Sequence, residues 1–180
     1  MPQSVARGFS FIGLLIGISI VGILLSLTLA QVSFLDQLLV RTELNQLYAT
    51  CCYAQQVAQM RQAHCDIVCN RDKNSYACDN HVRQLPRSVV FGVKQGVLGP
   101  PCGGHTLVTD PITFKYACIR SSANGTLSAG TVYLVDTGKR YQYALSSAIT
   151  QVSYIRCYRY DTQFHIMDES NRPLNYVQKN

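Results

Sequence analysis

The most constraining feature of this sequence is a long run without charge near its start. Residues 8–35 contain no Asp, Glu, Lys or Arg, and the nearest charges are Arg7 before the run and Asp36 after it. A helix of roughly 20 apolar residues crosses the hydrocarbon core of a bilayer, so the run is long enough to do so. Inside lipid the backbone must satisfy its own hydrogen bonds, which a helix achieves. The run therefore predicts a helix able to span a membrane.

A cleaved secretory signal peptide is one alternative for this run. Such a peptide has an apolar core of about 7–15 residues, followed by a cleavage site with small residues. Here the apolar run is longer, no A-x-A-like site follows it, and the small residue Gly8 precedes it directly after Arg7. A signal peptide is therefore disfavoured, while an ordinary membrane anchor that stays in the mature chain remains a second alternative.

The beginning of the run carries a more specific motif. Gly8 and Phe9 follow a short basic leader and open an apolar series that continues to residue 24. This pattern resembles the N-terminal signature of type IV pilins and type II secretion pseudopilins. The resemblance implies that prepilin peptidase cleaves between Gly8 and Phe9 on the cytoplasmic side and methylates the new amine of Phe9. Residues 1–8 would then be a prepilin leader, and the apolar helix would stay in the mature protein.

The chain departs from that signature at Gly13, where most members of the family carry a glutamate. In the family, this carboxylate pairs with the N-terminal amine of a neighbouring subunit, which a glycine cannot do. The resemblance therefore implies a minor subunit at the filament surface or tip rather than the bulk subunit. Gly13 and Gly17 form a G-x-x-x-G pair that lets membrane helices approach closely, although glycine is also simply more frequent in such helices.

Charge and cysteine content indicate the compartment. The net charge is +6, with Arg7 before the apolar run and Asp36 after it. The positive-inside rule then predicts a single-pass protein of the bacterial inner membrane, with its N-terminus inside and a periplasmic C-terminal domain. An even number of cysteines in an oxidising compartment favours disulfides, whose pairing cannot be deduced from sequence. The eight cysteines are Cys51, Cys52, Cys65, Cys69, Cys78, Cys102, Cys118 and Cys157.

The predicted fold class is α+β, with a long N-terminal transmembrane α-helix packed on a small antiparallel β-sheet domain, as in pilins. The helix is expected over residues 9–62, of which 9–35 would be the transmembrane or filament-core part. A β-rich globular domain would follow over 63–167, and a polar C-terminal tail over 168–180. Apolar residues at three- and four-residue spacing predict the buried face of the helix. They are Val40, Leu44, Leu47, Cys51, Ala54 and Ala58.

The globular part reads mostly as strands. The clearest hairpin joins residues 131–136 and 140–146 around a Thr137-Gly138 turn, and further strands are expected at 152–160 and 163–167. By contrast, the cysteine-rich stretch 65–85 shows no clear periodicity and predicts a loop held by disulfides. The hairpin and the arginine-bearing strand after it loosely resemble those of H-type minor pseudopilins.

A second hairpin is expected where residues 105–109 and 112–119 flank an Asp-Pro turn signal. In that register Cys102 and Cys118 would lie nearly opposite each other, which makes them the favoured disulfide. A zinc site is the alternative use of the cysteines, because zinc takes Cys and His ligands. Its candidate ligands are His64, Cys65, Cys69, Cys78 and His81. No second tight pair completes a familiar zinc pattern, so neither a metal nor a cofactor is predicted.

No catalytic motif is recognisable, and the chain is not expected to be an enzyme. One strand gathers basic and aromatic residues: alternation places Tyr154, Arg156 and Tyr158 on one face, with Arg159 on the other and Arg140 in the preceding hairpin. Arginine binds phosphates and aromatic rings stack on bases, so this face is a candidate DNA-binding surface. A solvated strand face rich in tyrosine is the plainer interpretation.

The leading functional prediction is a minor pilin or pseudopilin, a structural subunit of a type IV pilus or type II secretion filament. Its expected partners are other pilin or pseudopilin subunits, prepilin peptidase and inner-membrane lipid. The alternative is a DNA-binding minor pilin for natural transformation, with DNA as a further partner. The sequence does not distinguish a secretion system from a retractile pilus or a competence apparatus.

Overall fold

The computed structural model describes residues 11–101, 104–148, 154–161 and 163–167, and the side chains of residues 27–33 lie outside that description. The described residues therefore leave out the leader with its cleavage site, Gly8 and Phe9, the disulfide candidate Cys102 and the polar tail. The chain divides into two compact units, Met1–Leu35 and Asp36–Asn180, each described below by itself.

A single helix, α1 (Phe11–Arg61), runs through the described residues of the first unit and into the second. Its C-terminus is a Schellman motif, in which Gln62 adopts a left-handed φ of 50°. The amide of Gln62 donates to the carbonyl of Gln59 at 3.4 Å, and the amide of Ala63 donates to that of Ala58 at 3.2 Å. The helix thus ends within one residue of the predicted position.

The prediction of a membrane span over residues 9–35 is corrected. In the part of the chain that the structure describes, no helix combines the length and the hydropathy needed to cross a membrane. The transmembrane helix of the predicted fold class, the single-pass topology and the placement in the bacterial inner membrane are corrected with it.

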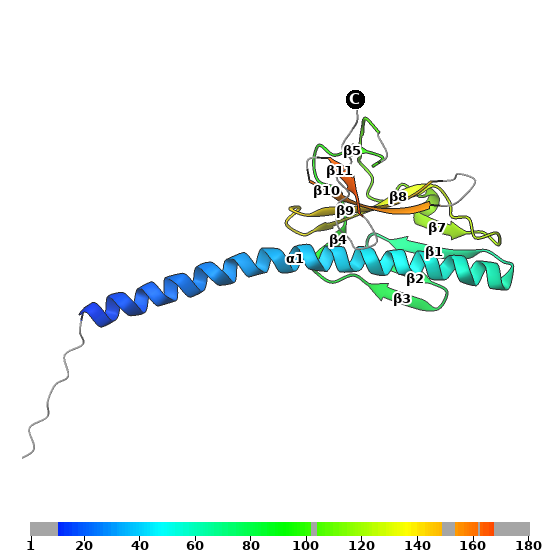
Figure 1. Ribbon diagram of the computed structural model, residues 1–180. Helices are drawn as coiled ribbons and strands as arrows, with labels where there is room; N and C mark the ends of the chain where they lie inside the picture. Colours follow the sequence, from blue (N-terminus) through cyan, green and yellow to red (C-terminus); the bar gives the residue numbers. More distant parts are fainter. Residues whose placement is uncertain (1–10, 102–103, 149–153, 162, 168–180) are drawn as a thin grey trace, which may run out of the picture. The chain divides into compact units, whose positions relative to one another are not determined.

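The second half of α1 buries one face against the strands that follow. The six residues predicted from their spacing are all fully buried, with exposed fractions of 0%. Spacings of three and four residues keep side chains on one side of a helix with 3.6 residues per turn. The predicted stripe is confirmed, and Figure 1 shows β1, β2 and β3 alongside this half of the helix.

A four-stranded antiparallel sheet occupies the stretch expected to be a loop. Its strands are β1 (Cys65–Asn70), β2 (Ser75–Cys78), β3 (His81–Gln84) and β7 (Cys118–Ser121), in the order β3-β2-β1-β7. The prediction of a loop over 65–85 was wrong because its cysteines were interpreted as disulfide crosslinks of a polar loop and not as buried apolar residues of a strand. A free cysteine packs as a small apolar residue, and Cys65, Ile67 and Cys69 alternate inward along β1.

A five-stranded antiparallel sheet forms the rest of the second unit. Its strands are β4 (Val89–Phe91), β8 (Gly130–Asp136), β9 (Gln142–Ala148), β10 (Tyr154–Tyr160) and β11 (Phe164–Ile166), in the order β11-β10-β9-β8-β4. The predicted hairpin around Thr137-Gly138 is confirmed, with Val135 opposite Gln142. The buried Asp136 closes it by accepting a hydrogen bond from the amide of Tyr141 at 2.6 Å.

The second predicted hairpin, over 105–119, was wrong. The strand β6 (Thr106–Leu107) pairs with β5 (Leu98–Gly99), while β7 pairs with β1 and leaves Cys118 opposite Val68. Between β6 and β7, the carboxylate of Asp110 accepts a hydrogen bond from the amide of Ile112 at 3.3 Å. Ile112 then forms a bridge to Val132 in β8, so the chain joins the other sheet instead of folding back on β6.

Candidate functional site

The most unusual surface in the described residues is the N-terminal part of α1, residues 11–26, which we call the apolar segment. Its large apolar side chains are between 46% and 72% exposed. They are Phe11, Ile12, Leu14, Leu15, Ile16, Ile18, Ile20, Val21, Ile23, Leu24 and Leu25. These residues lie on every side of the helix, and a helix that is hydrophobic all round is ordinarily buried.

The two glycines singled out from the sequence lie on this segment. An added Cβ at Gly13 or Gly17 would meet nothing within 4 Å. Together with Leu14, Ile18 and Val21, they line a shallow apolar groove of about 300 Å³. Small residues at four-residue spacing allow the backbone of another helix to approach closely, so this groove is the part of the segment best shaped to receive one.

The two described serines of the segment do not interrupt its apolar character. The hydroxyl of Ser19 donates to the carbonyl of Leu15 at 2.8 Å, and that of Ser26 donates to the carbonyl of Ile23 at 2.7 Å. Serine hydroxyls in helices commonly return to a carbonyl one turn earlier in this way. Each hydroxyl proton thus has a hydrogen-bond acceptor within the helix. The segment can be covered by apolar groups without leaving either hydroxyl donor unpaired.

The candidate DNA-binding residues are only partly brought together. Tyr154 and Arg156 are exposed, and the guanidinium of Arg156 lies 5.6 Å from the ring centre of Tyr154. Arg140, however, is paired with Asp36 at 2.6 Å and lies 3.6 Å from Asp136. Its charge is therefore already offset by carboxylates and offers less to a phosphate.

Tyr158 is unavailable as a stacking platform. It is 1% exposed and packs edge-on against Phe164 of β11, with ring centres 6.3 Å apart. Arg159, on the other side of the strand, is half-buried opposite Tyr143 and His165. Tyr154, Arg156 and Tyr158 share one face of β10, as strand alternation predicts. The strand β11 packs over the end of this face that carries Tyr158, so this ring is not exposed.

Seven of the predicted disulfide candidates are described, and all are free thiols. Cys51, Cys65, Cys69 and Cys78 are buried, while Cys52, Cys118 and Cys157 are half-buried. The sulfur atoms of Cys65 and Cys78 lie 3.8 Å apart. Cys102 lies outside the described residues, so the favoured pairing of Cys102 with Cys118 stays a prediction.

The zinc alternative is not assembled among the described residues. No three His, Cys, Asp or Glu side chains there converge as metal ligands do. His64 is exposed beyond the end of α1, and His81 is exposed on the edge strand β3. The two histidines are thus exposed, whereas the three candidate thiols, Cys65, Cys69 and Cys78, are buried.

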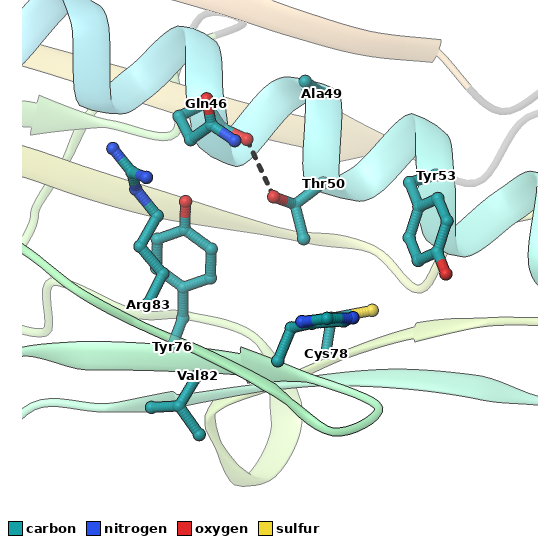
Figure 2. Close-up of a pocket in the computed structure, with 9 residues that line it drawn as sticks. Gln46, Ala49, Thr50, Tyr53, Tyr76, Cys78, Val82 and Arg83 are labelled. Carbon is teal, nitrogen blue, oxygen red and sulfur yellow. Dashed lines mark hydrogen bonds between the residues drawn. The ribbon is translucent and has the colours of Figure 1, made fainter.

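A feature that sequence reasoning missed is a groove of about 430 Å³ between α1 and the β2–β3 hairpin. In Figure 2, Tyr76 and Cys78 lie across this groove from Thr50 and Tyr53 of α1. Burial raises the pKa of Tyr76 to about 12. The dashed line in Figure 2 marks the hydroxyl of Thr50 donating to the carbonyl of Gln46 at 2.8 Å.

Arg83 of β3, which lines the groove, forms an ion pair with Glu43 of α1. Glu43 is only 4% exposed. The signal for this pair was present in the sequence, because Glu43 stands three residues after Val40 and one before Leu44, both on the buried stripe. A charge placed so close to a buried face needs a partner.

The groove holds no activated thiol. His81 lies opposite Cys78 in the β2–β3 pairing, an arrangement that would suit a cysteine nucleophile with a histidine base. Burial nevertheless raises the pKa of Cys78 to about 12, whereas reactive cysteines have a lowered pKa.

Comparison with known proteins found no match to any family model, curated protein or solved structure. The function is therefore argued from the surfaces described above.

Proposed function

We propose that this chain is a structural subunit of a helical filament of the pilin or pseudopilin kind, in which the apolar segment packs among the equivalent helices of other subunits. The observation that carries the proposal is the segment itself, because its large apolar side chains are exposed on every side of the helix. The Gly8-Phe9 motif supports the same function, since it resembles the processing site of that family.

Approximate energies support this packing. Each large side chain of the segment is about half exposed, so covering the rest of it contributes roughly 1 kcal/mol. The eleven side chains together contribute on the order of 10 kcal/mol. Bringing a subunit into an assembly costs about 4–15 kcal/mol in lost freedom. A single partner would cover only one side of the helix, so the available energy is reached with several neighbours, as in a bundle or filament.

A crosslinking experiment in cells that produce the full chain tests this function. A photoactivatable residue replacing Ile16, which is 56% exposed, is expected to capture the apolar helix of another subunit, identified by mass spectrometry. The matched control carries the same residue at Val82 in β3, which is 73% exposed. Capture from Val82 alone, or capture at Ile16 of a partner without such a helix, would contradict the proposal.

Substitution gives a second test of the same proposal. Ile16→Glu puts a charge into the surface to be covered, and burying an unpaired charge is costly. We therefore expect this variant to be lost from sedimentable assemblies, whereas Val82→Glu remains in them.

The DNA-uptake alternative would rest on Tyr154 and Arg156, and a gel shift with Arg156→Ala tests it. Salt-sensitive binding that this change removes would favour that alternative.

A further inference from the structure

The two thiols of the β1–β2 hairpin are positioned against each other. Ile67 is the residue directly opposite Cys78, and Cys65 stands two residues before Ile67 on the same face of β1. Cys65 is 4% exposed and Cys78 is 3% exposed, so both are almost completely buried. Their sulfur atoms are 3.8 Å apart, which is within van der Waals contact.

We propose that Cys65 and Cys78 are an oxidisable pair that forms a disulfide closing the open end of the β1–β2 hairpin. A disulfide has an S–S distance of about 2.05 Å, so the two sulfur atoms, now 3.8 Å apart, must approach each other by roughly 1.8 Å. Such an approach is available to side-chain rotation combined with a small strand shift, because Cys65 begins β1 and Cys78 ends β2. The pair does not depend on the apolar segment, so the proposal stands apart from the filament function.

The groove between α1 and the β2–β3 hairpin gives an oxidant a route to the pair. Cys78 is one of its lining residues, and Figure 2 shows this side chain facing the groove near Tyr53 and Thr50. The volume of about 430 Å³ is in the range of small-molecule sites. An oxidant that enters this groove therefore meets the side of Cys78, whereas Cys65 is not among the lining residues.

The chemistry is thiol–disulfide exchange in two steps. The thiol of Cys78 loses a proton, and its thiolate attacks one sulfur of the oxidant, which breaks the oxidant's S–S bond and releases one thiolate. The thiol of Cys65 then loses its proton and attacks the mixed disulfide at Cys78, which releases the second thiolate. Both released thiolates take up a proton. In total, two protein thiols are oxidised by two electrons, and one small disulfide is reduced to two thiols.

The surroundings of Cys78 favour the neutral thiol and so make the first step slow. Burial raises its pKa to about 12, the Cys65 thiol and the Asp79 carboxylate act in the same direction, and Arg61 opposes them. Because the thiolate is the nucleophile, the rate is expected to rise with pH over the range in which the protein stays folded. His81, opposite Cys78 across β2 and β3, also lies in this groove.

Peptide mapping of the oxidised full chain tests the pairing. The reduced protein is treated with oxidised glutathione, remaining thiols are blocked, and the chain is digested without reduction. Trypsin leaves Cys65 and Cys69 on one peptide, residues 62–71, so a second protease that cuts before Asp66 is needed to separate them. The expected product links residues 62–65 to residues 74–78.

Variants and stability provide the controls. Cys118→Ser, whose half-buried thiol lies on β7, is expected to form the same link, whereas Cys65→Ser with Cys78→Ser cannot. Closing a loop of this length stabilises a chain enough to raise Tm by about 8 °C. A Cys65 peptide joined to another cysteine, or both thiols blocked in a chain that has stayed folded with the oxidant, would overturn the proposal. If the double variant does not fold, the map of the unaltered chain still decides.

Discussion

Arg83 holds Glu43 through two parallel hydrogen bonds, from its Nε at 3.0 Å and from an Nη atom at 2.8 Å. This pair joins the exposed edge strand β3 to the buried face of α1. Glu43 is almost completely buried, and the guanidinium is its partner across the groove. A two-point contact of this kind fixes geometry as well as charge, so it sets how the β2–β3 hairpin lies against the helix.

Removing Arg83 is therefore expected to destabilise the second unit markedly. Arg83→Ala leaves the carboxylate of Glu43 buried without its partner, which costs about 3 kcal/mol. Denaturant unfolding of the full chain would measure this loss. The matched control is Arg120→Ala, because Arg120 makes the same two-point contact with Asp66, at 2.8 and 2.7 Å, on a surface where Asp66 is 35% exposed. The control should lose clearly less, because exposed ion pairs contribute little to stability, and equal losses would contradict the role given to burial.

The Asp66–Arg120 pair predicts a dependence of stability on acid. The hydrogen bond from Arg120 lowers the pKa of Asp66 below its ordinary value of 3.8. A lowered carboxyl pKa stabilises the folded state above the unfolded pKa, and this contribution is lost as the pH falls through the folded pKa. The difference in Tm between the unaltered chain and Asp66→Asn should be constant from pH 7 to about 5. It should become smaller as the pH falls below 3.8, the ordinary pKa of the carboxyl group. A difference that grows toward low pH would refute this.

The groove at Gly13 and Gly17 predicts that the helix of a neighbouring subunit packs closely against this side of the apolar segment. Gly17→Leu fills the groove, and we expect it to weaken assembly about tenfold, equivalent to about 1.4 kcal/mol. Quantitative crosslinking from Ile16 would measure the change. Gly22→Leu is the control, since Gly22 also faces open space but lies on the opposite side of the helix. If both variants assemble equally well, the groove has no special part in packing.

The Gly8-Phe9 motif predicts the N-terminus of the mature chain. Gly8→Leu should leave a precursor that keeps Met1 to Gly8, because the resemblance places cleavage directly after this small residue. Intact mass spectrometry distinguishes the two products, and the unaltered chain is expected to begin with N-methylated Phe9. Ser4→Leu, a change elsewhere in the leader, should be processed normally. A native product that retains residues 1–8 would show that the motif does not act as a processing site.

Several features of the site could not be predicted from the sequence and became apparent only in the folded structure. Cys65 and Cys78 were candidates among eight cysteines, and antiparallel pairing of β1 with β2 brings these two together. Tyr158 was expected to be free, but β11 covers it. Both outcomes depend on which strands become neighbours, and that choice is made by contacts between residues distant in sequence.

By itself, the sequence determined the features that depend on local periodicity. It predicted the buried face of α1 and the β8–β9 hairpin, because a helix repeats every 3.6 residues, a strand every two, and a tight turn joins neighbouring strands. Only the tertiary structure decided that β7 joins β1 instead of β6 and that Glu43 meets Arg83. Such contacts join segments separated by dozens of residues, and their free energy depends on burial that no local pattern records.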